Sequence, residues 1–393
     1  MLLLGVGVAL AAVWGIATLW SRGSLVHLAY RRSVQPQRIF PDEPVNLVVT
    51  VENRKLLPVP WLRIEEDVPE ILQVAGQELS SHNLPQRAIL RSFWSLGWFE
   101  RVSRRYTLHL PERGWYALGP TRLISGDLFG LRAEERVESD VDRVTVYPRL
   151  IPLERLGLPA GRPPGETRME NPLAEDPLFV AGVREYTPGD RLRRIHWPAS
   201  ARTGRLQAKL YEPRAEVAAA IFLNVATYLH PWEGIDRRRA EFAISLAASL
   251  AADFSNRDIP VGLYANGHAP DLGTRVRIPP HRRRDSLGGI LDTLAKLAPY
   301  GTCSLEQLLE EELPRLRHGT TLVVVTAVAA DGLWECLARA ARLGYRVVVL
   351  LLEDAAAEAA GAARVAAMAL AGIAVHRIAG GGAPGEEVLH VAE

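Results

Sequence analysis

The sequence predicts a multidomain protein in which an N-terminal transmembrane helix is followed by an all-β sandwich and then by a doubly wound α/β domain. Three observations predict this order. The first twenty residues carry no charged side chain, apolar residues then alternate with a period of two as far as residue 150, and from residue 214 apolar strands alternate with amphipathic helices. The length of 393 residues suits two domains of roughly 100–200 residues each.

Residues 1–20 are predicted to form the transmembrane helix. At 1.5 Å per residue this helix would cover about 30 Å, the thickness of the hydrocarbon core of a bilayer. Positive charges follow the segment instead of preceding it, at Arg22, Arg31, Arg32 and Arg38. This distribution predicts a single-pass protein of the cell membrane with the bulk of the chain in the cytoplasm. The alternative is an atypical signal peptide that exports everything after it.

Residues 34–150 are predicted to form the β-sandwich domain. Glycine and proline separate short alternating segments at intervals typical of an antiparallel sandwich. The expected strands lie within residues 38–68 and at 88–95, 103–110, 115–118, 121–124 and 144–148. The sequences ERGWYALGP (112–120) and GDLFGL (126–131) are expected to form tight corners.

Residues 151–183 are rich in proline and glycine and are predicted to be a linker, and residues 184–213 form a separate segment that is discussed below. Residues 214–380 are predicted to form the α/β domain, and residues 381–393 a loose tail. Because continuous apolar strands are buried on both faces, the sheet should be mainly parallel and covered by helices on both sides. The expected strands are 217–225, 260–265, 275–278, 320–326, 346–352 and 374–378, and the expected helices are 237–254, 285–297, 305–316, 333–343 and 355–370.

The composition disfavours several classes of ligand. Because 46 Lys and Arg residues balance 45 Asp and Glu residues, no overall field attracts nucleic acid, and no nucleic-acid partner is expected. Cys303 and Cys336 do not have the spacing of metal ligands and fit a reduced compartment. No glycine-rich phosphate loop follows the first α/β strand, so no cofactor is expected.

A metal site is also disfavoured at the first turn of the α/β domain. Ligands of such a sheet bind at the carboxyl ends of its strands, where a divalent cation would need an Asp-x-Ser-x-Ser pattern. The chain places Asn224, Ala226 and Tyr228 in that register, and Thr302 and Asp331 could add oxygens from other loops. The sequence therefore predicts a degenerate site without metal.

Residues 184–213 concentrate chemically active side chains, including the serine, histidine and aspartate of a possible hydrolase. Asp190, His196 and Ser200 lie close in sequence, but no G-x-S-x-G motif surrounds Ser200. No catalytic residue is therefore predicted, and a hydrolase remains the alternative.

The favoured interpretation of this segment is structural. Its arginines would pair with nearby carboxylates, while Tyr186, His196 and Trp197 would pack beneath them. Surplus arginines could instead bind an acidic protein surface. The arginines are Arg184, Arg191, Arg193, Arg194 and Arg202, and the carboxylates are Glu185, Asp190 and Glu212.

The segment resembles the signature of the bacterial membrane proteins grouped as the domain of unknown function 58 family. Further likeness lies in NRKLLPVPWL (53–62), ERGWYALGP and DLFGL (127–131). The matching signature positions are Arg184, Glu185, Tyr186, Gly189, Asp190, Arg193, Ile195, Trp197, Ser200, Ala201, Arg202, Leu206 and Glu212.

The resemblance implies an α/β domain similar to a von Willebrand factor A domain, and partners that include a MoxR-type AAA+ ATPase and a transglutaminase-like membrane protein. We therefore expect a membrane-anchored, non-enzymatic adaptor or scaffold that works with the ATPase in the assembly or maturation of a client complex. Besides the hydrolase, metal-dependent adhesion is the other alternative. The expected docking residues are Arg184, Glu185, Tyr186, Gly189, Asp190, Arg193, His196, Trp197, Ser200 and Arg202.

Overall fold

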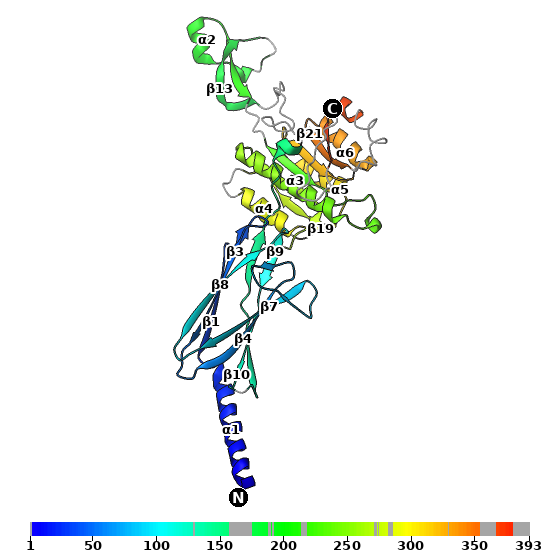
Figure 1. The fold of residues 1–393 in the computed structure, drawn as a ribbon. Helices are drawn as coiled ribbons and strands as arrows, with labels where there is room; N and C mark the ends of the chain where they lie inside the picture. The colour runs from blue at the N-terminus through cyan, green and yellow to red at the C-terminus, as the bar shows by residue number, and fades with distance from the viewer. Residues whose placement is uncertain are drawn as a thin grey trace. The chain divides into compact units, whose positions relative to one another are not determined.

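The computed structural model describes most of the chain, which divides into two compact units (Figure 1). Unit 1 comprises Met1–Leu150 with Leu291–Leu297, and unit 2 comprises Ile151–Ile290 with Ala298–Glu393. The described residues are 2–128, 130–156, 175–187, 190, 192–213, 218–270, 273, 275–281, 286–328, 330–353 and 367–379, without the side chains of residues 2–5, 8–10, 175–181, 210–213, 231 and 353.

Unit 1 begins with helix α1 (Leu2–Ser24), which covers residues 2–20 of the predicted transmembrane helix. The Lys55 ammonium group caps its C-terminal end by donating to the carbonyl oxygens of Ser24 and Val26, at 2.5 and 2.6 Å. No helix among the described residues is long and apolar enough to cross a membrane. The predicted span lies partly outside the described side chains, which exclude those of residues 1–5 and 8–10.

Unit 1 then forms a β-sandwich, as the alternating pattern predicts. Its first sheet has the order β1 (Leu28–Gln35), β3 (Val45–Asn53), β8 (Arg101–His109) and β5 (Gln73–Val74). The second has the order β11 (Ala133–Glu138), β10 (Thr121–Gly126), β4 (Val59–Pro69), β7 (Arg87–Leu96) and β6 (Ser80–Ser81). A small third sheet has the order β2 (Arg38–Ile39), β12 (Asp142–Val146) and β9 (Gly114–Leu118).

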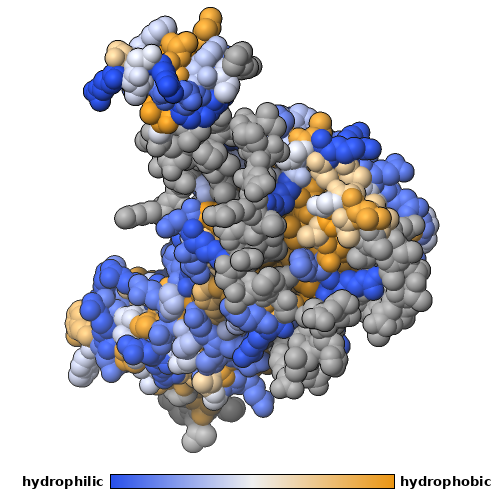
Figure 2. Space-filling view, turned by 90° about the horizontal axis from the view of Figure 1, so that it is seen from above, coloured by the Kyte–Doolittle hydropathy of each residue, from blue (hydrophilic) through white to orange (hydrophobic). Residues whose placement is uncertain are grey.

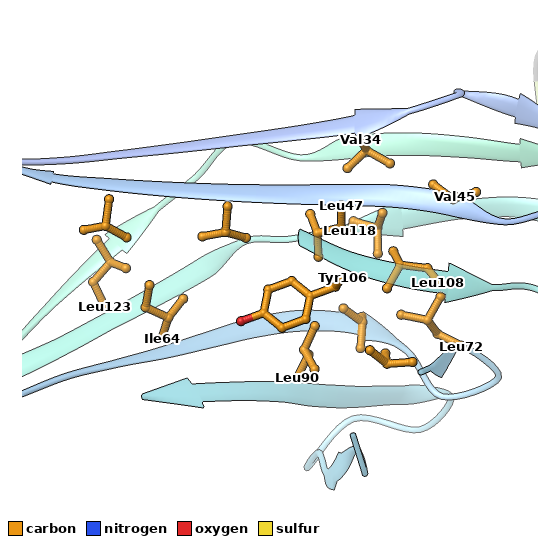
Figure 3. Close-up of a cluster of buried hydrophobic side chains, with 14 of the residues drawn as sticks. Val34, Val45, Leu47, Ile64, Leu72, Leu90, Tyr106, Leu108, Leu118 and Leu123 are labelled. Atoms are coloured by element: carbon orange, nitrogen blue, oxygen red, sulfur yellow. The ribbon is translucent and has the colours of Figure 1, made fainter. Parts of the chain in front are cut away.

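The core of the sandwich is built from alternate residues of facing strands. Leu47 of β3 and Ile64 of β4 are fully buried, and both belong to one cluster of apolar side chains. Figure 3 shows the Tyr106 ring of β8 lying among aliphatic side chains of this cluster. The sequence analysis did not predict β1 or β11, because charged residues interrupt the apolar alternation in both strands.

Unit 2 contains a six-stranded sheet of the doubly wound kind, as predicted. Five strands run parallel, and β18 is antiparallel at one edge. The order reverses between β15 and β20, which makes the carboxyl end of β15 the topological switch point. The order is β18 (Val276–Ile278), β16 (Val261–Ala265), β15 (Ala219–Leu223), β20 (Thr321–Thr326), β21 (Arg346–Glu353) and β22 (Ala374–Ala379).

Helices cover both faces of this sheet (Figure 1). Ala220 and Phe222 of β15 share an apolar cluster with α5 (Leu305–Glu312) and α6 (Asp331–Arg342). Ile221 points to the opposite face because side chains alternate along a strand, and α3 (Arg237–Asn256) contacts β15 there. Helix α4 spans Ser286–Lys296, and a two-residue strand, β17 (Gly267–His268), pairs with β19 (Ala298–Gly301).

The segment between the two predicted domains contains more regular structure than a linker. A 3₁₀ turn, η1 (Leu153–Leu156), has two buried leucines, and strand β13 (Glu175–Glu185) occupies residues assigned above to the linker. Backbone pairing with β14 (Gln207–Pro213) stabilises β13. Because such pairing cannot be predicted from local composition, the sequence analysis assigned these residues to the linker. Residues 157–174, the first part of the helix expected at 355–370, and the tail from residue 380 lie outside the described residues; residues 367–370 are helical.

Candidate functional site

The segment that carries the predicted docking residues is a β-hairpin with a small helical excursion. Strands β13 and β14 pair antiparallel, with Glu185 opposite Gln207. Two backbone hydrogen bonds close the excursion, from the Tyr186 amide to the Leu206 carbonyl at 2.9 Å and from the His196 amide to the Gln207 carbonyl at 2.7 Å. Residues 186–206 therefore form a closed loop around one end of the hairpin.

Asp190 holds the first half of this loop. Its carboxylate accepts two hydrogen bonds from the Arg184 guanidinium, at 2.7 and 2.5 Å, and two from the amide and hydroxyl of Thr187, at 3.0 and 2.9 Å. The Tyr186 hydroxyl donates to the Asp190 carbonyl oxygen at 3.2 Å. The Arg184 hydrogen bonds, and then those from Thr187, hold the pKa of Asp190 well below its usual range. Asp190 therefore serves here as a fixed anion that fastens the turn to β13.

His196 and Ser200 hold the second half, in helix α2 (Trp197–Thr203). His196 Nδ1 accepts a hydrogen bond from the Ala199 amide at 3.1 Å and so caps the helix. The Ser200 hydroxyl donates to the His196 carbonyl oxygen at 3.1 Å and accepts from the Gln207 amide at 2.9 Å. Gly204 ends the helix with a left-handed backbone, φ 69°, which glycine adopts without a steric penalty. Ser200 thus fastens α2 to the start of β14.

The three side chains of the possible hydrolase are not joined in a relay. Among the described residues, no hydrogen bond links the His196 ring to Asp190 or to the Ser200 hydroxyl. Each of the three is instead bonded to a backbone group or to Arg184. The arrangement therefore lacks the base-to-nucleophile hydrogen bond that activates a catalytic serine.

Other signature side chains remain at the surface. Arg193 and Arg202 are exposed, and within the described part of the chain neither guanidinium has a partner. Trp197, the first residue of the short helix α2, is 66% exposed, so the expectation that it packs beneath the arginines is wrong. Figure 2 shows hydrophobic and hydrophilic residues interspersed on the face in view.

Of the remaining predicted positions, some are buried, some are exposed, and some lie outside the described residues. Ile195 is buried and forms a β-bridge with Ala208. Glu185 pairs with Arg205 at 3.4 Å, with both side chains exposed. Gly189, Arg191 and the side chain of Glu212 lie outside the described residues.

A second group of polar side chains meets at the switch point of the α/β sheet. Asn224 donates from Nδ2 to Thr326 Oγ1 at 3.0 Å, and Asn266 donates from Nδ2 to Asn224 Oδ1 at 2.8 Å. Asn266 Oδ1 accepts from the Val225 amide at 2.9 Å, and the Cys303 carbonyl oxygen accepts from Asn266 Nδ2 at 3.0 Å. The side chains of Asn224, Asn266 and Thr326 are buried. This neutral network joins the ends of β15, β16 and β20.

The network occupies the place where the sequence analysis looked for a metal site. Thr302 lies beside it, since its hydroxyl donates to the Asn266 carbonyl oxygen at 2.8 Å. Tyr228 is exposed, Ala226 offers no side-chain oxygen, and Asp331 begins α6. No group of three or more His, Cys, Asp or Glu side chains within the described residues is arranged to hold a metal ion.

Sequence reasoning missed Asn266 and Thr326 as partners of Asn224. Asn266 directly follows β16, and Thr326 is the last residue of β20. Each of three apolar strands has a polar residue at its carboxyl end, and this pattern in the sequence could have indicated that the three side chains meet.

A comparison with known protein families found a match that contains the signature segment. The family described as "Protein of unknown function DUF58" matches residues 182–367. Residues 182–367 of this chain belong to the DUF58 family. The match begins in β13, where Arg184 lies, and includes the switch-point network and most of the α/β sheet.

A curated relative is also similar to part of this chain. The "Uncharacterized protein YeaD" of Bacillus subtilis (strain 168) is 26% identical over 186 residues, which cover 46% of this chain and 44% of the relative. The alignment thus spans less than half of that protein. The description of the family names no activity.

Solved structures show weaker likeness. The CARDB domain of the PF1109 protein from Pyrococcus furiosus is 13% identical, covers 30% of this chain and 91% of that domain, and has a TM-score of 0.21. A cohesin module from a Clostridium perfringens family 33 glycoside hydrolase is also 13% identical, with 30% of this chain and 96% of the module covered and a TM-score of 0.23. TM-scores of this size carry no functional argument for a DUF58 protein.

Proposed function

We propose that this protein is a membrane-attached, non-enzymatic adaptor that binds an acidic protein surface through Arg193, Trp197 and Arg202. The single observation that carries the proposal is that the side chains of the signature segment fall into two groups, one hydrogen-bonded within the loop and one exposed. Its hydrogen-bonding side chains are used to hold the loop, whereas two unpaired arginines and a tryptophan remain exposed in the described part of the segment. The partner that the family resemblance suggests is a MoxR-type AAA+ ATPase.

The exposed residues have the chemistry of a binding surface. Tryptophan and arginine are among the side chains most enriched in the residues that dominate protein–protein binding energies. Arg193 and Arg202 carry positive charge without a neighbouring carboxylate in the described part of the segment, which favours an acidic partner. A partner carboxylate could accept both hydrogen bonds of a guanidinium fork.

The hydrogen bonds that hold the loop, which we call the frame, also favour binding. The Arg184–Asp190 pair and the Ser200 hydrogen bonds fix the backbone on both sides of the exposed residues. A loop that is already ordered loses less conformational entropy when a partner binds. The frame therefore raises affinity without contacting the partner.

The α/β unit is proposed to act as a von Willebrand factor A-like scaffold without a metal-dependent contact. At the switch point, the Asn224 amide already has hydrogen-bonding partners on both its oxygen and its nitrogen. A neutral amide also attracts a divalent cation less than a carboxylate does. The surface of this unit would then bind through ordinary polar and apolar contacts.

Membrane attachment is the other part of the proposal. The first twenty residues carry no charged side chain, and Trp14, Ile16 and Leu19 of α1 are more than half exposed. We propose a location at the cell membrane with the soluble units in the cytoplasm, beside the ATPase and a transglutaminase-like membrane protein. The client complex would be brought to the ATPase at that surface.

Binding to the cognate MoxR-type ATPase tests the docking proposal. The full chain is purified in detergent and titrated with the ATPase, with and without the paired substitution Arg193→Glu and Arg202→Glu. We expect at least a roughly tenfold loss of affinity, which corresponds to about 1.4 kcal/mol.

The matched control is Arg105→Glu with Arg342→Glu, which makes the same charge change at two exposed arginines outside the segment. This control should bind like the wild type. Equal affinity of the Arg193 and Arg202 variant and the wild type would refute direct docking.

A further inference from the structure

Three turns of the sandwich lie at the end from which α1 leaves, beside β10 (Figure 1). These are the turns between β3 and β4, between β7 and β8, and between β10 and β11. The strand register places all three turns at that end. Leu28, at the start of β1 just after α1, pairs with Asn53, the last residue of β3. Val59, at the start of β4, pairs with Leu96, the last residue of β7, and Leu62 of β4 pairs with Ser125 near the end of β10.

Each of these turns exposes large apolar side chains. Leu56, Trp98, Phe99, Leu128 and Leu131 are all more than half exposed, and we call them the apolar rim. Soluble surfaces rarely gather so many large apolar residues in neighbouring turns unless they bind something. The rim therefore indicates an interaction surface at the α1 end of unit 1.

Phe99 gives independent support. Its backbone has φ 47°, in the left-handed region that Gly and Asn adopt more readily than an aromatic residue. Its ring is 65% exposed and so gains little from packing within the chain. Neither the turn nor the core explains a phenylalanine at this position. An external apolar contact explains it.

The charges around the rim favour an anionic lipid surface over water. Acidic groups at this end have partners within the chain: Glu52 pairs with Arg54 and Arg101, each at 3.0 Å, and the exposed Glu100 accepts a hydrogen bond from the Gly97 amide at 2.6 Å. The Asp127 carboxylate accepts from the backbone amides of residues 131 and 132, at 3.2 and 2.7 Å.

Cations remain beside the rim. Arg22, at the end of α1, is exposed and has no partner within the described residues. The Arg132 guanidinium lies over the Trp14 ring, 5.2 Å from its centroid, and so joins the third turn to α1. Aromatic residues and cations arranged in this way are typical of the interfacial layer of a membrane.

We propose that the apolar rim is a lipid-binding surface, which rests in the interfacial layer of an anionic membrane next to α1. This inference rests on the membrane attachment proposed above and adds a second contact to it. With three turns on the lipid surface, the sandwich is held at a fixed height and tilt, which a single helix followed by a short connection would not achieve.

Site-specific fluorescence tests the placement. In a full chain carrying Cys303→Ser and Cys336→Ala, single cysteines are introduced by Leu56→Cys, Phe99→Cys or Glu78→Cys and labelled with an environment-sensitive dye. Glu78 is exposed and follows β5, which pairs with the far end of β8, so it is the control. Thermal unfolding confirms that each labelled variant is folded. The proteins are mixed with vesicles of phosphatidylcholine, with or without phosphatidylglycerol, and separated by flotation.

We expect the protein to float with the vesicles and the dyes at residues 56 and 99 to shift to the blue and be quenched by interfacial nitroxide lipids, most strongly with phosphatidylglycerol. The dye at residue 78 should not change. Flotation without any change at residues 56 and 99 would overturn the lipid surface while membrane attachment stands. Equal changes at all three positions would also overturn it, and failure to float would overturn membrane attachment itself.

Discussion

Arg184 binds Asp190 through both oxygens of the carboxylate, at 2.7 and 2.5 Å, from a position six residues earlier in the chain. Two hydrogen bonds from Thr187 complete the coordination of that carboxylate. The pair closes the first half of the signature loop, just as Ser200 closes the second. Asp190 and Ser200 therefore both hold this loop through hydrogen bonds, and the exposed arginines are the residues that we propose for binding.

The first prediction concerns the pH dependence of the Asp190 anchor. Hydrogen bonds from Arg184 and Thr187 hold the pKa of Asp190 below its unfolded value of about 3.9. The anchor therefore contributes stability that is fully present above about pH 4 and is lost as the pH falls through the folded pKa. At pH 7, Asp190→Asn should speed amide hydrogen exchange in residues 184–207, and this difference should shrink below about pH 4.

Glu185→Gln is the control for this measurement, since Glu185 is exposed and makes only a long ion pair with Arg205 among the described residues. Its exchange should match the wild type at both pH values. An Asp190→Asn effect of the same size at pH 3 and pH 7 would contradict the anchor.

The second prediction concerns Ser200. Ser200→Ala removes one hydrogen bond to the His196 carbonyl and leaves the Gln207 amide without its partner. We expect a local loss of about 1–2 kcal/mol, measured as faster exchange of the amides of α2 and β14. Thr203→Ala is the control, because it removes an exposed hydroxyl of the same helix, and it should cost less than about 0.5 kcal/mol. Equal effects of the two substitutions would argue against Ser200 as the link between α2 and β14.

The same side chain provides a test of the hydrolase alternative. The wild type should not react with a serine-directed fluorophosphonate probe, because no base is hydrogen-bonded to the Ser200 hydroxyl among the described residues. Labelling that disappears in Ser200→Ala would sink the structural interpretation of this residue.

The third prediction concerns the switch-point network. Asn266→Ala removes the acceptor of the Val225 amide and the donor to Asn224 Oδ1, inside a buried site. We expect unit 2 to lose about 2–4 kcal/mol in denaturant unfolding. Asn256→Ala makes the same change at the exposed end of α3 and should cost less than about 0.5 kcal/mol. Equal losses in the two variants would show that the network is not stabilising.

The fourth prediction concerns Lys55, which caps α1. Burial, and then the nearby charge of Arg136, lower its pKa to about 8. The unfolded lysine has a pKa of about 10.4, so between these values the unfolded chain binds a proton that the folded chain does not. The melting temperature of unit 1 should therefore gain a contribution that rises from about pH 8 to pH 10 in the wild type and is absent in Lys55→Met. Lys209→Met, a change in unit 2, should retain the rise, and a rise that persists in Lys55→Met would assign it to another group.

Much of the fold follows from periodicity alone. In β3, alternate burial of Leu47 and Val49 matches the alternating sequence, and in β15 every residue is apolar and buried on both faces. These patterns are local, so each strand carries its own signal. The strands β1, β13 and β14 lack that signal and are stabilised by pairing with other strands.

The sequence by itself determined the two fold types, their order, and the stretch in which chemically active side chains concentrate. Only the tertiary structure decided what those residues do. The roles of Asp190, His196 and Ser200 depend on which donor or acceptor comes within hydrogen-bonding distance, and that depends on backbone pairing between β13 and β14. The tertiary structure likewise decides that Trp197 is exposed whereas Ile195, two residues earlier, is buried.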